Sequence, residues 1–176
     1  MNKILLVLST FLLVQFSFAA HHETGEHTAK AIIGYETSDE GVNMDIQVGD
    51  LAAIKVWVNY VEAHNTRDLD AINNANAEDF KGWAANGVIV DGPVAHADFL
   101  KEWFAASNPS WKYKYAIAND VVQKDGSTNH WVTSAYTVTD TIDGKQVTSE
   151  EMYDVRIENG KIKTIYVAAR AVIAEE

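Results

Sequence analysis

The stretch from residue 50 to residue 72, DLAAIKVWVNYVEAHNTRDLDAI, sets the pattern on which the rest of the fold is built. Apolar side chains recur through its first half at helical spacing: Leu51, Ile54, Val58 and Val61. This spacing predicts an amphipathic helix that begins at the N-cap Asp50 and ends near His64. A turn follows, and Asp68 is placed to cap a second, shorter helix.

The rest of the domain is expected to contain mostly strands. Residues 80–83 and 87–92 predict two short strands around a turn, and residues 96–104 predict a third helix. Four longer strands are expected at the end of the chain: 111–117, 130–139, 146–157 and 162–172. Asp-Gly, Asp-Gly and Asn-Gly pairs separate them, and such pairs are strong hairpin signals. Helices followed by an antiparallel meander indicate an α+β fold, with about three helices packed on one face of a curved sheet.

The first nineteen residues have the features of a secretory signal peptide. Lys3 precedes an apolar run over 4–14, and the small residues Ser17 and Ala19 stand where a signal peptidase reads the chain. A membrane anchor is the alternative, but the run is shorter than the roughly 20 apolar residues that a span needs. We therefore expect cleavage after Ala19 and a mature protein that is periplasmic or secreted.

Residues 20–49 read as a polar tail ahead of a single domain over 50–174. Within the tail, 32–35 and 42–46 could each form a short strand or pack on the domain. Imidazole and carboxylate groups at His21, His22 and His27, beside two glutamates, could bind a divalent metal. The segment has no helical or strand period, so the entropy cost of ordering it favours a solvated tail. We predict no metal site and no cofactor.

Composition excludes several classes of function. The chain has no cysteine, and hence no disulfide, thiolate metal site or cysteine nucleophile. The formal net charge of -11 disfavours nucleic acid and anionic membranes as partners. Simple solubility is a commoner reason for an acidic surface than a cationic partner.

Residues 57–72 resemble the N-terminal part of proteins in the nuclear transport factor two-like superfamily. Within that superfamily the resemblance is to the SnoaL-like polyketide cyclase group. An amphipathic helix ending in Asn, a short turn and Asp-Leu-Asp are shared, and Glu78-Asp79-Phe80 follows at a similar interval. Residues 153–162 are similar to the closing hairpin of that family, with its Gly-Lys-Ile turn. The resemblance covers about residues 50–172. It implies a cystatin-like cone, a curved sheet wrapped by helices around an apolar cavity, and many relatives dimerise through the sheet.

The best-known enzyme of this fold, ketosteroid isomerase, needs a base carboxylate, a donor tyrosine and a protonated aspartic acid. By resemblance, Tyr60 falls at the place of the donor tyrosine. The position of the base falls near Trp83-Ala84, and that of the second acid falls at Tyr153, so neither carboxylate is present. The pattern therefore argues against steroid isomerisation.

Another acid/base arrangement is compatible with the residues. If Glu151, Tyr153, Val155 and Ile157 form the inward face of their strand, Glu151 lies near the cavity mouth and Tyr153 lies deeper. A carboxylate there, opposite Tyr60, could act as a general acid or base. The alternative is a solvated Glu151 at the rim and tyrosines that only form the wall.

The candidate ligand-binding residues are mainly aromatic. Five tryptophans and seven tyrosines are more aromatic surface than a core requires, and such side chains in a concavity favour flat or apolar ligands. We expect Trp111, Tyr113 and Tyr115 to share one face of a strand as a contiguous wall. The full set of expected lining residues is Trp57, His64, Trp83, Trp111, Tyr113, Tyr115 and His130.

Two functions from different classes remain open on this basis. The first is an exported SnoaL-like protein that binds a small apolar or aromatic molecule, with isomerase-, cyclase- or hydrolase-like acid/base chemistry as an extension. The second is a non-enzymatic homodimeric interaction module whose cone is filled by side chains. The sequence does not decide whether the protein is an enzyme, because fold alone does not fix function.

Overall fold

The computed structural model describes residues 29–172. The predicted signal peptide, residues 1–19, and the histidine-rich stretch 21–27 lie outside the described residues. No helix in the described range is long and apolar enough to cross a membrane.

The three predicted helices are confirmed: α1 spans Leu51–Thr66, α2 spans Leu69–Ala75 and α3 spans Pro93–Ala106. Asp50 caps α1 by accepting a hydrogen bond from the Ala52 amide at 2.8 Å, and Asp68 caps α2 through the Ala71 amide at 2.9 Å. Helix α1 ends where Arg67 adopts left-handed backbone angles, with φ of 62°.

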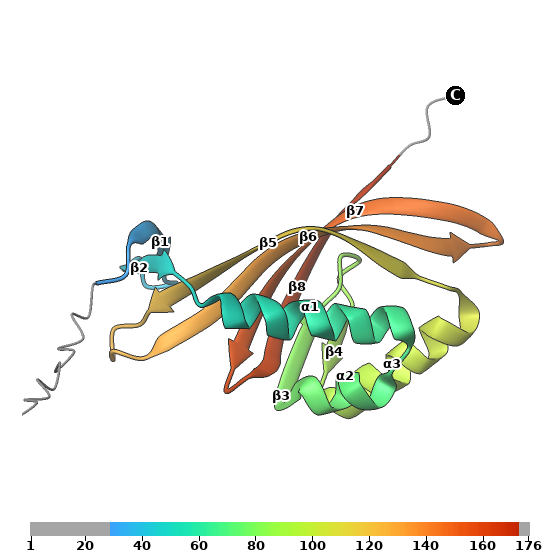
Figure 1. Cartoon of the computed structure of the whole chain (residues 1–176), viewed down its shortest axis with the longest axis horizontal. Coiled ribbons are helices and arrows are strands. Elements are labelled where there is room, and N and C mark those ends of the chain that lie inside the picture. Colours follow the sequence, from blue (N-terminus) through green and yellow to red (C-terminus); the bar gives the residue numbers. More distant parts are fainter. Residues whose placement is uncertain (1–28, 173–176) are drawn as a thin grey trace, which may run out of the picture.

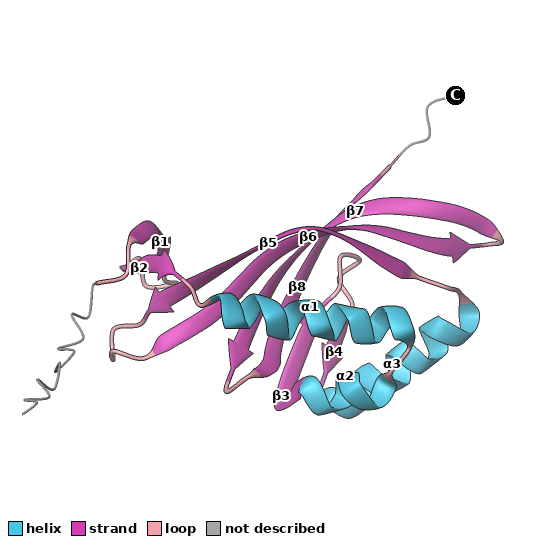
Figure 2. Ribbon diagram, in the orientation of Figure 1, coloured by secondary structure: helices cyan, strands magenta, loops and turns pink. Residues whose placement is uncertain are grey.

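The sheet has eight strands, and its last four form the predicted meander. Strands β1 (Ile32–Thr37), β2 (Asn43–Val48), β3 (Asn76–Trp83), β4 (Ile89–Asp91), β5 (Ser110–Val122), β6 (Thr128–Ile142), β7 (Lys145–Glu158) and β8 (Lys161–Ala171) make it up. Their order is β1-β2-β5-β6-β7-β8-β3-β4, and the β3–β8 pair alone is parallel among the described strand pairs. The sheet arches over the three helices, which all lie on one of its faces (Figures 1 and 2). The α+β cone predicted from the sequence is confirmed.

Strands β1 and β2 form a hairpin inside the range that the sequence assigns to a polar tail. For the apolar stretches 32–35 and 42–46, the sequence left open a short strand or packing on the domain. Both stretches form strands. The hairpin joins the edge of the meander through β2 and β5, beside the start of α1 (Figure 1). Gly49 makes this join possible, since a Cβ on it would lie 2.5 Å from the backbone nitrogen of Asn119.

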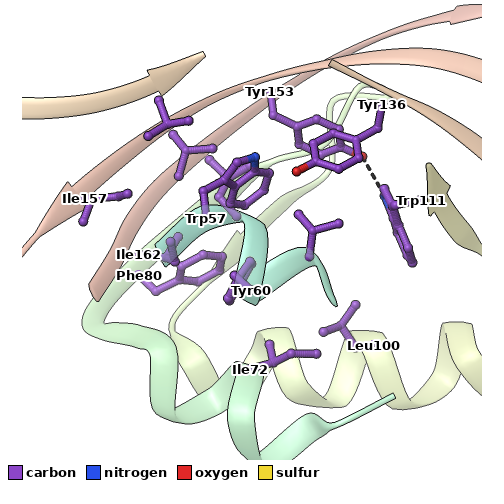
Figure 3. Packing of buried hydrophobic residues seen from close by; sticks show 14 of the residues in the cluster. Trp57, Tyr60, Ile72, Phe80, Leu100, Trp111, Tyr136, Tyr153, Ile157 and Ile162 are labelled. Carbon is purple, nitrogen blue, oxygen red and sulfur yellow. Dashed lines mark hydrogen bonds between the residues drawn. The ribbon is translucent and has the colours of Figure 1, made fainter. Parts of the chain in front are cut away.

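The core lies between the helices and the inner face of the sheet. Tyr153, Val155 and Ile157 of β7 are buried there, so the condition set in the sequence analysis is met, and the alternate residue Met152 is half exposed on the outer face. Trp57 of α1 occupies the centre, with Tyr60 on one side and Tyr136 and Tyr153 on the other (Figure 3). The helices thus cover part of the sheet, and the space between them and β3, β7 and β8 is not completely filled.

Candidate functional site

A cavity of about 630 Å³ lies between α1, α3 and the inner face of the sheet. Its volume is within the range of small-molecule sites in proteins. The apolar part of its lining is formed by Trp57, Val61, Phe80, Trp83, Val90, Phe99, Leu100, Trp103, Trp111, Ile165 and Val167. Its larger polar side chains are Tyr60, His64, Asn86, His96, Glu102, Glu151 and Tyr153, of which Asn86 and Glu102 are exposed. The cone is therefore hollow.

Trp57 divides the polar groups of the cavity into two centres. Its ring centroid lies 5.6 Å from that of Tyr60 and 5.4 Å from that of Tyr153. The indole nitrogen donates a hydrogen bond of 2.7 Å to the hydroxyl of Ser134, which is completely buried. Packing and this hydrogen bond both hold the indole in place between Tyr60 and Tyr153. The centres also meet directly, since the ring of His64 packs edge-on against that of Trp111 with centroids 5.6 Å apart.

The first centre is a carboxylate on the cavity wall. Glu151 accepts a hydrogen bond from the Tyr153 hydroxyl and another, of 2.9 Å, from the Ser149 hydroxyl. The Tyr153 oxygen in turn accepts a 2.8 Å hydrogen bond from the Trp111 indole nitrogen. Burial, together with the adjacent carboxylate of Glu151, raises the pKa of Tyr153 well above its ordinary value. The phenol therefore stays protonated and orients the carboxylate, which can exchange protons with a ligand or a water molecule.

The second centre lies on the cavity floor, where α1, α3 and the start of β3 meet. The Tyr60 hydroxyl donates a hydrogen bond of 2.8 Å to Oδ1 of Asn76. The amide nitrogen of Asn76 lies 3.1 Å from Nδ1 of His96. His64 packs beside them, with Nδ1 2.8 Å from the backbone oxygen of Tyr60 and its ring centroid 5.7 Å from that of His96.

Both imidazoles of this floor are uncharged at neutral pH. Burial lowers the pKa of His64 to about 4, with a further decrease from the charge of Arg67. Burial also lowers the pKa of His96 to about 3, and the neighbouring His64 adds to the effect. Burial raises the pKa of Tyr60 well above its ordinary value. The floor is polar but carries no charge at pH 7.

Seven of the ten residues singled out from the sequence line this cavity: Trp57, Tyr60, His64, Trp83, Trp111, Glu151 and Tyr153. Glu151 and Tyr153 are in direct contact, whereas Tyr60 belongs to the floor and lies beyond Trp57. The Tyr60 hydroxyl proton is used within the protein, in the hydrogen bond to Asn76.

The other three residues lie elsewhere. Tyr113 is half exposed and packs edge-on against Tyr136, with ring centroids 5.7 Å apart. The register of β5 against β6 shifts between Tyr113 and Tyr115, which is a β-bulge. Tyr115 pairs with Ala135, on the opposite face to Tyr136, so the expectation that Trp111, Tyr113 and Tyr115 share one face is wrong.

His130 is also remote from the cavity. It lies near the start of β6, and its Nδ1 is 2.7 Å from a carboxylate oxygen of Asp120. Lys30 forms an ion pair of 2.5 Å with the same buried carboxylate. His130 therefore belongs to a charged cluster at the edge of the sheet, where the N-terminal hairpin joins.

Two residues of the floor, His96 and Asn76, were not among the candidate site residues. The sequence predicts that the third helix begins at His96, but the N-cap of α3 is Gly92. His96 precedes the buried Leu100 by one helical turn, and this spacing could have placed it on the buried face. Asn76 lies at the junction of α2 and β3, and no sequence pattern marks it.

In the part of the chain that the structure describes, no group of three or more histidine, aspartate or glutamate side chains is arranged to hold a metal ion. The chemistry that the lining residues themselves can supply is hydrogen bonding and proton transfer.

No protein-family profile matches the sequence, and no curated protein matches it. Solved structures do match. A proposed polyketide cyclase from Xanthomonas campestris pv. campestris has a TM-score of 0.56 and 20% identity, over 66% of this chain and 88% of that one. An LEH-like epoxide hydrolase from M. tuberculosis has a TM-score of 0.57 and 17% identity, over 67% and 82%.

The epoxide hydrolase/cyclase-like enzyme SalBIII, whose structure is described for pyran ring formation in the polyether salinomycin, is also similar. Its TM-score is 0.56 at 16% identity, over 68% of this chain and 91% of that one. At such identities the likeness establishes the fold alone. The resemblance to nuclear transport factor two-like proteins, predicted from the sequence, is confirmed at the level of the fold.

Proposed function

We propose that this nuclear transport factor two-like cone binds a small, largely apolar or aromatic molecule and performs acid/base chemistry on it at Glu151. The observation that carries the proposal is the cavity of about 630 Å³ with a hydrogen-bonded carboxylate in an aromatic wall. Such a combination of apolar lining and few directed polar groups is typical of ligand sites.

Glu151 is the proton-transferring group in this proposal. Its carboxylate is oriented by Tyr153 and Ser149, and the Tyr153 hydroxyl is itself held by Trp111. A carboxylate held in this way can remove a proton from the ligand or from a water molecule that attacks it, and later return the proton. Isomerisation, cyclisation and hydrolysis can all proceed by such proton transfers without an external oxidant or reductant.

The binding part of the proposal can be tested by fluorescence. Trp57, Trp83, Trp103 and Trp111 line the cavity, so titration with a panel of small hydrophobic molecules is expected to change the tryptophan emission saturably. A flat response across the panel would contradict the proposal and favour the alternative of a non-enzymatic module. The cavity already argues against an interaction module whose cone is filled by side chains.

The catalytic part is tested by turnover. A screen could follow two probes. Deuterium exchange of 2-tetralone requires only proton transfer. In hydrolysis of styrene oxide the carboxylate removes a proton from water, the water oxygen bonds to carbon as the epoxide C–O bond breaks, and the ring oxygen takes up a proton. Glu151→Gln should lower any activity found by roughly 100-fold, the usual scale of general acid/base catalysis, while ligand binding persists. Tyr60→Phe should lower it less, since Tyr60 acts through the floor. Unchanged rates in both variants would remove the assignment.

We also propose that the mature protein works outside the cytosol as a homodimer. The predicted signal at residues 1–19 supports export, and mass spectrometry of the secreted chain should find its N-terminus at Ala20.

The outer face of the sheet supports pairing of two copies, because it carries the half-exposed apolar side chains Tyr115, Ile117, Met152 and Tyr166. Size-exclusion chromatography with light scattering should give twice the chain mass, and a monomer would contradict the dimer.

A further inference from the structure

The proposed proton transfer at Glu151 assigns no role to the two histidines of the cavity floor. His64 of α1 and His96 of α3 both line the cavity, each with only 8% of its surface exposed. Their ring centroids are 5.7 Å apart, about the length of two successive hydrogen bonds. The hydrogen bonds made by each Nδ1 atom determine what its Nε2 atom can offer.

His64 presents a hydrogen-bond acceptor. Its Nδ1 lies 2.8 Å from the backbone oxygen of Tyr60, and a carbonyl oxygen can only accept, so Nδ1 carries the proton. The buried imidazole is neutral, and its Nε2 therefore holds a lone pair.

His96 presents a hydrogen-bond donor. The Tyr60 hydroxyl donates to Oδ1 of Asn76, and in this orientation the NH₂ group of the amide faces Nδ1 of His96, 3.1 Å away. The Tyr60 hydroxyl oxygen also lies 3.2 Å from this nitrogen. With the amide in this orientation Nδ1 of His96 accepts, and the proton of this neutral imidazole is on Nε2. Tyr60 and Asn76 act as positioning residues that set the tautomer of His96.

Both Nε2 atoms are free to meet a ligand. Neither has a hydrogen-bond partner within residues 29–172, and neither is among the fully enclosed polar atoms that lack one. Neither nitrogen is therefore completely enclosed, and the side chains that carry them line the cavity. The floor thus offers one acceptor and one donor side by side, without charge.

We propose that His64 and His96 together bind the hydroxyl group of an uncharged alcohol or phenol, as a refinement that rests on the proposed function of the cavity. The hydroxyl oxygen accepts the proton of His96 Nε2, and the hydroxyl proton is donated to His64 Nε2. A methyl ether lacks the donor, and a carboxylate lacks it too and would bring an unpaired charge into a buried site. The aromatic lining receives the apolar skeleton of the ligand.

The test compares three probes of one skeleton, 2-naphthol, 2-methoxynaphthalene and naphthalene, by isothermal titration calorimetry at neutral pH. Wild-type protein should bind 2-naphthol about tenfold more tightly than either of the others, as expected for a pair of neutral hydrogen bonds. Equal affinities for the three probes would overturn the hydroxyl site and leave the proposed function intact. No saturable binding of any probe would contradict the proposed function, and the hydroxyl site with it.

Two conservative variants test the assignment to these residues. His64→Asn can keep the donor to the Tyr60 carbonyl and removes the Nε2 acceptor, and His96→Asn can keep the acceptor for Asn76 and removes the Nε2 donor. Each should reduce the preference for 2-naphthol to about twofold or less. His130→Asn, the same change at a histidine outside the cavity, should leave it unchanged. A preference that persists in both cavity variants would overturn the proposal.

A measurement on the wild-type protein covers the case in which a variant does not fold. Imidazole ¹⁵N spectra should show the Nδ1–H tautomer for His64 and the Nε2–H tautomer for His96. Addition of 2-naphthol should shift the Nε2 resonances of both and leave those of His130 in place. The same tautomer at both positions, or no shift on addition of 2-naphthol, would contradict the proposal.

Discussion

Tyr153 connects the core of the protein to its candidate chemistry. Its hydroxyl accepts from the Trp111 indole and donates to Glu151, so one oxygen atom satisfies two other polar groups. The alternation of β7 places Glu151 and Tyr153 on the same face, and this much follows from the sequence. That this face is the inner one is decided by the fold. The Trp111 contact does not, because it joins side chains 42 positions apart.

Removing this hydroxyl should cost stability. We predict that Tyr153→Phe lowers the free energy of unfolding by about 1–3 kcal/mol, because the buried Trp111 nitrogen loses its partner. Tyr113→Phe is the matched control, since this half-exposed tyrosine packs through its ring, and its effect should be within about 0.5 kcal/mol. Urea unfolding followed by circular dichroism measures both, and equal effects would contradict a structural role for the Tyr153 hydroxyl.

At the scale of elements, the N-terminal hairpin depends on one glycine. Gly49 passes against the backbone of β5, and its amide donates a hydrogen bond of 3.1 Å to the Ala118 oxygen. A Cβ at this position would lie within 3 Å of three backbone atoms of Ala118 and Asn119, which cannot move aside as a flexible side chain can. The junction between β2 and α1 is therefore tightly constrained.

We predict that Gly49→Ala loosens the hairpin and leaves the cone folded. Amide hydrogen exchange in β2 should become faster by at least about tenfold, with little change in β6 and β7. Gly34→Ala is the control, because the nearest atom to its added Cβ is a side-chain carbon 3.9 Å away. Exchange in β2 that is unchanged in Gly49→Ala would show that the chain adapts to the methyl group.

At the scale of the whole molecule, the two buried histidines link stability to pH. In the unfolded chain each imidazole titrates near its ordinary pKa of about 6.5. In the folded chain burial lowers the pKa of His64 to about 4 and that of His96 to about 3. Between these values the unfolded chain binds more protons than the folded one, so stability falls as the pH decreases through this window.

We predict that the free energy of unfolding decreases between pH 7 and pH 5 by roughly 2 kcal/mol for each of the two histidines. Burial raises the pKa of Asp120, but hydrogen bonds from Lys30 and His130 lower it by more, so this pKa lies below its ordinary value. The effect of this carboxylate on stability therefore falls at lower pH than that of the histidines. Urea unfolding at both pH values measures the effect. The double variant His64→Asn/His96→Asn should lose most of the dependence, and His130→Asn should keep it. A wild-type stability that is flat over this range would contradict neutral, buried imidazoles.

The sequence by itself determined the fold class and most of its elements. Helical spacing over residues 50–64, the caps Asp50 and Asp68, and the Asp-Gly and Asn-Gly turns are local signals, and local signals fix helices and hairpins. They also grouped Glu151 with Tyr153 on one face of β7, and seven of the ten candidate site residues line the cavity.

Only the tertiary structure decided the rest. The bulge between Tyr113 and Tyr115 reverses a face, the β3–β8 pairing is parallel, and the floor unites Tyr60, Asn76 and His96 from three elements. None of these leaves a periodic mark in the sequence, because each depends on which distant segments are brought together and not on the order of residues within one. The tautomer of His96 was also decided by the tertiary structure, since Asn76, which faces its Nδ1, belongs to another element.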